Sequence, residues 1–415
     1  MERVRKNAPS HQSVAPQQFV APLDDGTVTL AMIQALIPVA LQAVEEALQC
    51  DVLALAGPRY AHHDAAPGVA RWGTQPGSIF LADQKVPITV PRVRDLRAGT
   101  ELPLATYAQL QHPRARDVGL FRRVLAGVST REYRAAAEAV PDAFGIAKSS
   151  VSRRFIRASA EALRQFHTRR HDDATWCVLL LDGKTCADDQ IVIALGVTTT
   201  GEKRVLGLVQ TATENKKSCA AFLRELVERG FTAATGLLVV LDGAKGLRAA
   251  VRDVFGEQVA VQRCQWHKRE NVLSYLPKAR HAEWRRKLQA ASAHGGAADA
   301  KRALLRLVDE LRVLNESAAR SLEDGLDETL TLHRLGLHAD LRQSLNTTNL
   351  IESVMAQIER KTQRVDQWRS SDQKQRWCAA TLLQIEQNFR RVRGFKHLPL
   401  LLAALTDKLP APAAA

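Results

Sequence analysis

Two stretches with one design decide the fold: CVLLLDGK at residues 177–184 and GLLVVLDGAKG at residues 236–246. Each is an apolar, β-prone run that ends in Asp-Gly, and the continuous apolar character of the second predicts a strand buried on both faces. An Asp at the end of a buried strand is held by a rigid element and faces the space beyond the sheet edge. The pattern therefore predicts two strands that present Asp182 and Asp242 as candidate active-site carboxylates.

Asp-Gly is also typical of tight β-hairpin turns, and this alternative applies to both stretches. For Asp182 it stays open, because another strand is expected from Ile191, although eight residues intervene, which is too many for a two-residue turn. For Asp242 it is weak, because a helical pattern follows at residues 246–256 instead of a partner strand.

Outward from these stretches the pattern predicts an α/β block. Further strands are expected at residues 191–197, 204–210 and 259–264, and a helix at 217–230 that Gly230 closes. The resulting order β-β-β-α-β-α-β is that of an RNase H-like, or retroviral-integrase-like, sheet. Residues 273–345 are rich in Arg, Ala and Leu at helical spacing, with a break at HGGAA, and are expected to form an all-helical insertion.

The N-terminal part predicts smaller modules. One or two helices are expected between residues 28 and 56, followed by a small β module with strands SIFLA and VPITV. A basic helical segment then has the layout of a helix-turn-helix, with Ser149 or Ser150 capping its last helix. The alternative is a three-helix bundle with a solvated basic face. The residues expected to contact DNA on that last helix are Lys148, Ser150, Ser152, Arg153 and Arg154.

These patterns give the domain organisation that we expect. It consists of a disordered N-terminus (1–27), a helical and small β module (28–100), a helix-turn-helix domain (101–172), the first part of the catalytic core (173–272), the helical insertion (273–345), the second part of the core with C-terminal helices (346–395) and a tail (396–415).

A third candidate carboxylate, Glu352, lies in NTTNLIESVMAQIER at residues 346–360. Ile351, Val354 and Ile358 form an apolar stripe on the predicted helix, and Glu352 stands on the flank of that stripe. A carboxylate there lies at the border between the core and an open cleft. The specific alternative is a capping box, because Asn349 and Glu352 are three residues apart where the helix starts.

Composition limits the class of partner. Lys and Arg number 58 against 44 Asp and Glu, which gives a net charge of +14 and favours polyanions such as nucleic acid. The six cysteines are scattered without close pairs, which argues against a disulfide framework and for a reducing compartment. The longest apolar runs are strand-sized and too short to cross a membrane, so a cytoplasmic protein is expected.

Taken together, the three carboxylates fit a metal-dependent phosphoryl-transfer site. Mg²⁺ or Mn²⁺ needs hard oxygen ligands, and two such ions can serve the attacking and the leaving oxygen of an in-line displacement. Asp182, Asp242 and Glu352 are therefore the expected ligands of two ions. No Gly-rich phosphate loop or dinucleotide motif competes for the site.

The stretch from Val178 to Arg391 resembles the catalytic domain of mutator-type bacterial insertion-sequence transposases, members of the DDE transposase superfamily. The matching pieces are LDGK, LDGAKGL, RCQWHKREN and TNLIES, together with a helical insertion before the Glu. A Cys-x-x-His after the second Asp is a mark of this group, and it is present here as Cys264 and His267. PRVRD at residues 91–95 and the helix-turn-helix resemble the family's DNA-binding half.

The resemblance implies a DNA transposase that binds terminal inverted repeats, exposes a 3′-hydroxyl by hydrolysis and joins it to target DNA. It implies action at the bacterial nucleoid and a homodimer or larger assembly on double-stranded DNA. The alternatives are a domesticated DNA-binding regulator and an RNase H-like nuclease that hydrolyses without joining.

Other residues near the motifs carry two interpretations each. The resemblance places Cys264 and His267 near the active site, where His267 is expected to contact the scissile phosphate or the displaced strand. Cys-x-x-His is also half a zinc site, but the sequence has no second ligand pair at suitable spacing. Trp266 would stack on a flipped base or pack as an ordinary aromatic, and Cys264 would line the DNA or pack at a strand end. Two interpretations also remain for a set of basic residues. They contact DNA phosphates, or they lie on a solvated or salt-bridged surface: Lys184, Arg248, Arg360, Lys361 and Arg364.

Overall fold

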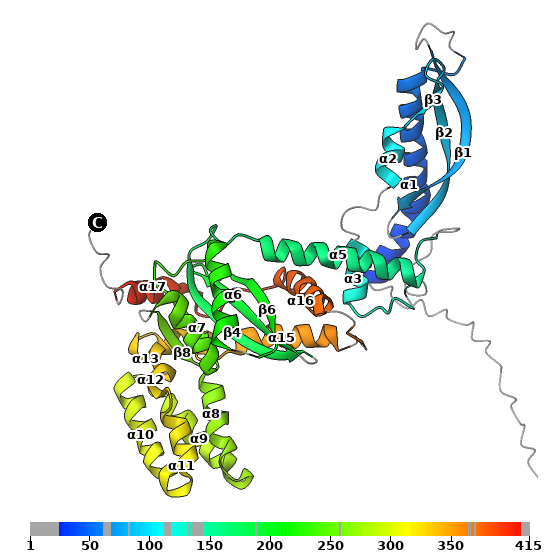
Figure 1. Ribbon diagram of the computed structural model, residues 1–415. Coiled ribbons are helices and arrows are strands. Elements are labelled where there is room, and N and C mark those ends of the chain that lie inside the picture. Colours follow the sequence, from blue (N-terminus) through cyan, green and yellow to red (C-terminus); the bar gives the residue numbers. More distant parts are fainter. Residues whose placement is uncertain are drawn as a thin grey trace, which may run out of the picture. The chain divides into compact units, whose positions relative to one another are not determined.

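The computed structural model consists of two compact units, one formed by residues 1–114 with 137–145 and the other by residues 115–136 with 146–415 (Figure 1). The residues that it describes are 25–60, 68–81, 84–111, 118–131, 133, 144–186, 189–213, 215–256, 259–363, 365, 367–368 and 371–407. Of the N-terminus predicted to be disordered (1–27), residues 1–24 lie outside this set and residues 25–27 are helical; residues 408–415 of the predicted tail (396–415) also lie outside it.

The smaller unit is a helix packed on a three-stranded antiparallel sheet. Helix α1 (Asp25–Ala56) begins close to the predicted position, and strands β1 (Val69–Leu81), β2 (Gln84–Asp95) and β3 (Thr100–Leu102) follow in spatial order. Helix α2 (Ala105–Gln111) completes it. Its core joins Leu48 and Val52 of α1 to Val90 and Val93 of β2. The hairpin predicted from SIFLA and VPITV is confirmed, because β1 and β2 pair along their length.

The larger unit is built on a five-stranded mixed sheet in the order β6-β5-β4-β7-β8. All five predicted strands are present, as β4 (Trp176–Cys186), β5 (Asp189–Thr198), β6 (Lys203–Thr211), β7 (Leu238–Leu241) and β8 (Ala260–Arg263). The first three form an antiparallel meander, whereas β7 pairs in parallel with both β4 and β8. The predicted mixed α/β class is confirmed.

Helices cover both faces of this sheet, and for this reason the central parts of its strands are continuously apolar. Leu179 and Leu181 of β4 pack with α6 (Lys216–Glu228) and α7 (Lys245–Phe255). Val178 and Leu180 point to the other face, where α15 (Asn349–Thr362), α16 (Ser371–Glu386) and α17 (Leu398–Thr406) lie. The central strand is therefore buried on both sides, which fixes its position in the unit.

A bundle of helices occupies the chain between β8 and α15, as predicted. It comprises α8 (Gln265–Ser274), α9 (His281–Ser292), α10 (Ala297–Leu314) and α11 (Glu316–Glu323), followed by the short helices α12 (Leu326–Thr329), α13 (Thr331–Arg334) and α14 (His338–Leu345). The predicted break falls between α9 and α10. The bundle has a core of its own around Trp284 and Leu311, and Figure 1 shows α8–α11 side by side.

The predicted helix-turn-helix is described only in part. Helices α3 (Val118–Leu125) and α5 (Lys148–Thr168) are present, but most of the helix expected between them lies outside the described residues. The predicted Ser cap is wrong, because α5 begins at Lys148 and its N-cap, Ala147, has no side-chain hydrogen bond. Phe155 packs α5 against Phe121 and Trp377.

No helix among the described residues combines the length and the apolar character needed to span a bilayer.

A buried histidine ties α5's C-terminal extension to the sheet. His171 is completely buried, its Nε2 donates to the Leu206 carbonyl at 2.9 Å, and its backbone N–H donates to the Arg229 carbonyl at 2.8 Å. Burial, reinforced by the Arg229 charge, lowers the pKa of His171 from 6.5 to about 4. The folded protein therefore holds this imidazole neutral.

We predict a pH-dependent loss of stability from this histidine. Below pH 6.5 the unfolded chain gains a proton at His171 that the folded chain does not, so stability present at higher pH is lost as pH falls towards 4. His171→Gln retains a donor for Leu206 but does not titrate. Between about pH 7 and 5, the wild-type unfolding free energy, measured by urea denaturation, should fall by about 2 kcal/mol more than that of the variant. Equal slopes for the two proteins would contradict the prediction.

Candidate active site

Asp182 and Asp242 are brought side by side by the parallel pairing of β4 and β7. In this register Leu181 is the partner of Leu241, so the next residue on each segment is one of the two aspartates. Strand β7 ends at Leu241, whereas β4 continues to Cys186 in its pairing with β5. Asp182 therefore lies within a strand, and not at its end as predicted, at the point where its neighbour on the other side stops.

The hairpin alternative for the two Asp-Gly pairs does not hold. The β4–β5 hairpin closes beyond the Cys186–Asp189 pair, and Asp182 pairs across it with Ile193. After Asp242 the chain turns into α7, with the Ala244 N–H donating to Asp242 Oδ1 at 2.8 Å. Gly243 is required here because its φ is +105° and a Cβ would come within 2.1 Å of Arg263 Nε. The turn thus holds the Asp242 carboxylate through the Ala244 N–H.

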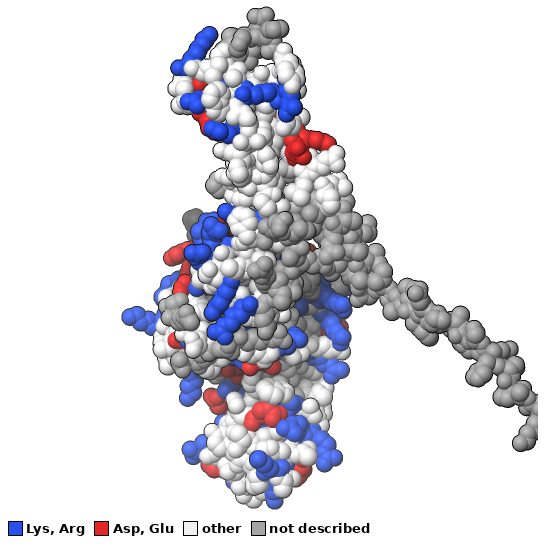
Figure 2. Space-filling view, turned by 90° about the vertical axis from the view of Figure 1, so that its right-hand side faces the viewer, with Lys and Arg blue, Asp and Glu red and all other residues white. Residues whose placement is uncertain are grey.

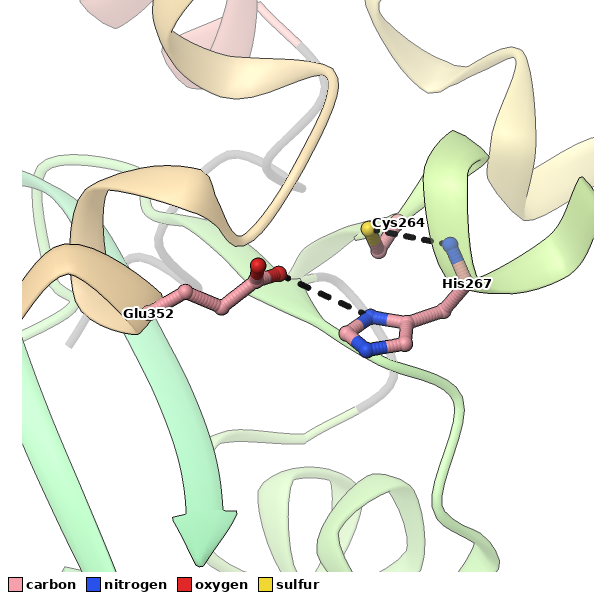
Figure 3. A group of neighbouring side chains, drawn as sticks. All are labelled: Cys264, His267 and Glu352. Atoms are coloured by element: carbon pink, nitrogen blue, oxygen red, sulfur yellow. Dashed lines mark hydrogen bonds and ion pairs between the residues drawn. The ribbon is translucent and has the colours of Figure 1, made fainter. Parts of the chain in front are cut away.

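Glu352 comes from the first turn of α15 and faces His267 (Figure 3). Its Oε1 lies 3.9 Å from His267 Nδ1 and accepts a hydrogen bond from Thr348 Oγ1 at 2.5 Å. The N-cap of α15 is Thr348 and not Asn349, so the capping box that would have explained Glu352 structurally is not formed. The carboxylate is instead half-buried among polar side chains at the border of the core.

A buried threonine, Thr348, connects these groups, and no sequence pattern marked it in advance. Its hydroxyl lies 3.2 Å from His267 Nδ1 and 3.3 Å from Cys264 Sγ, in addition to the contact with Glu352. A hydroxyl carries one proton, so the short contact to Glu352 takes it and the oxygen accepts from the imidazole. Thr348 thereby orients the carboxylate and the imidazole at once.

Cys264 anchors this arrangement from the end of β8. Its sulfur accepts from the backbone N–H of His267 at 3.5 Å and of Thr348 at 3.4 Å, and its side chain is fully buried. Burial opposes ionisation of Cys264, but hydrogen bonds from the side chain and backbone of His267 and from Thr348 outweigh it and lower its pKa. Cys264 is a packed residue and does not offer a DNA contact, which excludes one of the two interpretations given above.

Electrostatics link the three candidate carboxylates, although among the described residues only the group of Cys264, His267 and Glu352 has ligand atoms within 4.8 Å of one another. Burial, followed by the charge of Asp242, raises the pKa of Asp182 from 3.8 to about 7; His267 opposes this rise and Glu352 adds to it. The hydrogen bond to Cys264 raises the pKa of His267 to about 9, against burial and with help from Glu352 and Asp242. Three acidic groups from two strands and a helix thus act on one another.

The donor set fits a hard divalent cation. Asp182 and Asp242 offer only oxygen ligands, and the pKa of Asp182 is raised by burial first and then by repulsion from Asp242, which a bound cation would relieve. Cys264, His267 and Glu352 also have one ligand atom each within 4.8 Å of one another, a spacing that zinc would accept. The Cys264 sulfur, however, is engaged by backbone donors, so this trio is already satisfied as a hydrogen-bonded cluster.

The predicted DNA-contacting residues fall into different environments. Lys148 and Arg153 are exposed on α5, and Ser150 and Ser152 are partly so, but Arg154 is only 8% exposed and leaves no surface for DNA. Buried positions recur along an amphipathic helix, and Arg154 falls on that face, next to Phe155. Figure 2 shows Lys and Arg side chains spread over one face of the molecule with Asp and Glu between them (Figure 2).

Nearer the carboxylates, Trp266 is 43% exposed and lies edge-on to His267, with ring centroids 4.8 Å apart. Arg360 is exposed and Lys361 partly exposed near the end of α15, whereas Arg364 lies outside the described residues. Lys184 and Arg248 form ion pairs with Glu359 and Glu328, at 2.6 and 2.5 Å. The salt-bridge interpretation therefore applies to both in this structure.

Comparison with known proteins gives a consistent result. The family model described as "Transposase, Mutator family" matches residues 21–392. The transposase for insertion sequence element IS905 of Lactococcus lactis is 27% identical over 379 residues, which cover 88% of this chain and 93% of that protein. The transposase for insertion sequence element IS256 in transposon Tn4001 of Staphylococcus aureus is 24% identical over 316 residues, covering 73% and 77%. That for IS6120 of Mycolicibacterium smegmatis is 30% identical over 248 residues, covering 57% and 74%.

The crowding of carboxylates leads to a stability prediction for Asp182→Asn. The folded state holds the Asp182 proton more tightly than the unfolded chain, so ionisation of this group costs stability as pH rises from about 4 to about 7. The thermal midpoint of the variant at pH 8 should therefore be several degrees above that of the wild type. Each kcal/mol of unfolding free energy corresponds to roughly 2–4 °C. The difference should shrink towards pH 4, and Mg²⁺ should raise only the wild-type midpoint, as calorimetry can show. A variant less stable than the wild type at pH 8 would contradict this.

Proposed function

Because the chain belongs to the Mutator family of transposases, we propose that it is the transposase of an insertion sequence and that Asp182, Asp242 and Glu352 form its catalytic triad. It binds the terminal inverted repeats of its element, hydrolyses one strand at each end and joins the exposed 3′-hydroxyl to target DNA. The observation that carries this proposal is the pairing of β4 with β7, which sets Asp182 beside Asp242 with Glu352 within electrostatic reach.

The fold supports the same proposal. An antiparallel three-stranded meander, extended by two parallel strands with helices on both faces, is the arrangement expected of an RNase H-like core. We place Asp182 on its first strand and Asp242 after its fourth. Glu352 is on the helix that follows the inserted bundle. The three carboxylates would thus be delivered by three separate elements to one edge of the sheet.

Asp182 and Asp242 would share two Mg²⁺ or Mn²⁺ ions, and Glu352 would complete one of the sites. When bound, such ions favour deprotonation of the attacking hydroxyl and stabilise the leaving oxygen. In the first step a water oxygen attacks phosphorus, and the bond from phosphorus to the 3′-oxygen breaks. In the second step that 3′-oxygen attacks a target phosphodiester, whose own 3′-oxygen leaves. Each step forms one P–O bond and breaks one.

The neighbours of the triad would place substrate and carboxylate. With a pKa of about 9, His267 is cationic at neutral pH and suits contact with a DNA phosphate beside Glu352. Trp266 presents an exposed ring next to it and suits stacking on an unpaired base. Thr348 acts through Glu352 and His267, and is therefore a positioning residue.

The protein would also contact DNA at positions outside the triad. Lys148 and Arg153 are exposed near the start of α5, where a recognition-like helix offers its N-terminal residues. Arg360 and Lys361 near the end of α15 would contact the backbone. Joining two ends requires at least two copies of the chain, so we propose a homodimer or larger assembly on DNA.

Three substitutions test the proposed triad. Asp182→Asn, Asp242→Asn and Glu352→Gln keep the shape of each side chain and remove its charge, so cleavage and strand joining should fall by about a thousandfold or more while end binding without metal is retained. The assay uses oligonucleotides that carry the repeats flanking the gene, with Mg²⁺.

The same assay separates the alternatives. A wild-type protein that binds these ends without nicking them would be a regulator, and one that nicks without joining would be a nuclease. Strand joining by Asp242→Asn would refute the triad.

Thr348 gives a second prediction. Thr348→Val keeps the backbone donor to Cys264 but removes the hydroxyl that holds Glu352. Strand joining should fall about 10–100-fold and need more Mg²⁺ for half-maximal rate, as supporting residues of metal sites do. Thr348→Ser should restore both values.

Thr362→Val is the matched control, because Thr362 is also buried on this segment but its hydroxyl bonds only to helix carbonyls. If this control or the Ser variant lost as much activity as Thr348→Val, the role would be structural and not positional.

A further inference from the structure

Beside Asp242 lies a second concave site that the proposed chemistry does not use. It is a pocket of about 540 Å³ between the starts of α6 and α7, the end of β8 and the turn after α11. Gly243, the residue after the candidate catalytic aspartate, forms part of its wall. The other lining residues are Lys216, Lys245, Arg248, Ala249, Arg252, Asp253, Arg263 and Asp324. Five of these nine residues are Lys or Arg and two are Asp, so the pocket is cationic.

The carboxylates around the pocket do not neutralise it, because each serves two cations. Asp253 pairs with Lys216 and Arg224, Asp324 with Arg263 and Lys268, and Glu328 with Arg248 and Arg252. Three negative charges thus face six positive ones before Lys245 is added. Positive charges held this close repel one another, and a bound anion would relieve that repulsion.

Two arginines of the pocket wall also keep unsatisfied polar atoms, and the start of α7 is open. The Nε atoms of Arg248 and Arg263 are buried without a hydrogen-bond partner in the described part of the chain, and Arg263 is only 8% exposed. Lys245 is exposed at the first position of α7 and forms no ion pair within 4.0 Å among the described residues. The N-cap of α7, Ala244, provides no side-chain hydrogen bond, so the helix start offers its N–H groups to an anion.

From these features we infer that the pocket binds a phosphate of the DNA backbone, next to the one that is cut. The inference rests on the proposed function, and it adds a site at which the DNA strand is held on the α7 side of Asp242. Lys245 and the N-terminus of α7 contact the phosphate, Arg248 and Lys216 flank it, and Arg263 provides charge from below. Only two residues separate Asp242 from Lys245, so the contact sets the strand's position relative to the carboxylates.

The test asks whether the side chain of Lys245 contacts one particular phosphate of the DNA. End-bearing duplexes are prepared with a neutral methylphosphonate at each successive position around the cut, and their affinity for the wild type and for Lys245→Gln is measured without divalent metal. The wild type should lose about fivefold at one position, and Lys245→Gln should be about fivefold weaker on unmodified DNA. The methylphosphonate at that position should not weaken the binding of Lys245→Gln any further. The slope of its affinity against salt concentration should correspond to about one phosphate contact fewer.

Lys278→Gln is the matched control, because Lys278 is exposed in the inserted bundle and does not line the pocket. It should keep the wild-type response to every methylphosphonate. If every methylphosphonate weakened the binding of Lys245→Gln by the same factor as that of the wild type, the inference would be wrong. End binding, and with it the proposed function, would stand. A wild type that binds no duplex would overturn both.

A second measurement distinguishes DNA from free phosphate. Inorganic phosphate is titrated against the thermal midpoint of the wild type and of Lys245→Gln. If millimolar phosphate stabilises the wild type alone and no methylphosphonate position couples to Lys245, the pocket takes a small anion and the assignment to DNA is wrong.

Discussion

The arrangement of the site depends on one backbone interaction, the parallel pairing of β7 with β4. This pairing sets two carboxylates at adjacent positions of a buried sheet, where burial and then the charge of Asp242 raise the pKa of Asp182. Such a pair is tolerated because β4 is buried on both faces and cannot shift its register without exposing an apolar set. The cost of crowding the two carboxylates is thus offset by the packing of the core, a common relation between stability and activity.

The third carboxylate depends on a different kind of interaction. Glu352 belongs to a helix that packs against the sheet, but its side chain is oriented by Thr348 and His267, which Cys264 holds through backbone hydrogen bonds. Polar groups this deeply placed are useful only if all of them have partners. On the other side of Asp242, the cationic pocket extends the site towards α7. The carboxylates therefore stand between a hydrogen-bonded cluster and a region of positive charge.

Much of the fold could be predicted from the sequence, because the spacing of apolar residues and the length of apolar runs distinguish strands from helices. The five strands were marked by apolar runs, and both aspartates by their position after such runs. The end of the strand that bears Asp182 was predicted a few residues too early. Pairing with β5 extends β4 beyond its apolar part, which composition cannot show. Thr348 could not be found, since its importance comes from residues more than eighty positions away. The Ser cap and Arg154 were misjudged because a helix start and its buried face are decided by tertiary packing.

The inserted bundle leaves and re-enters the core at nearly the same point. Gln265 N–H donates to the Asn346 carbonyl at 2.9 Å, and the Asn346 amide donates back to Gln265 Oε1 at 3.2 Å. The excursion is thus tied at its neck and has its own hydrophobic centre. Since the entropy of closing a loop grows only slowly with its length, the exposed loop between α9 and α10, at residues 293–296, can be lengthened without displacing the helix that bears Glu352. The tie between Gln265 and Asn346 thus separates the length of that loop from the position of the third carboxylate.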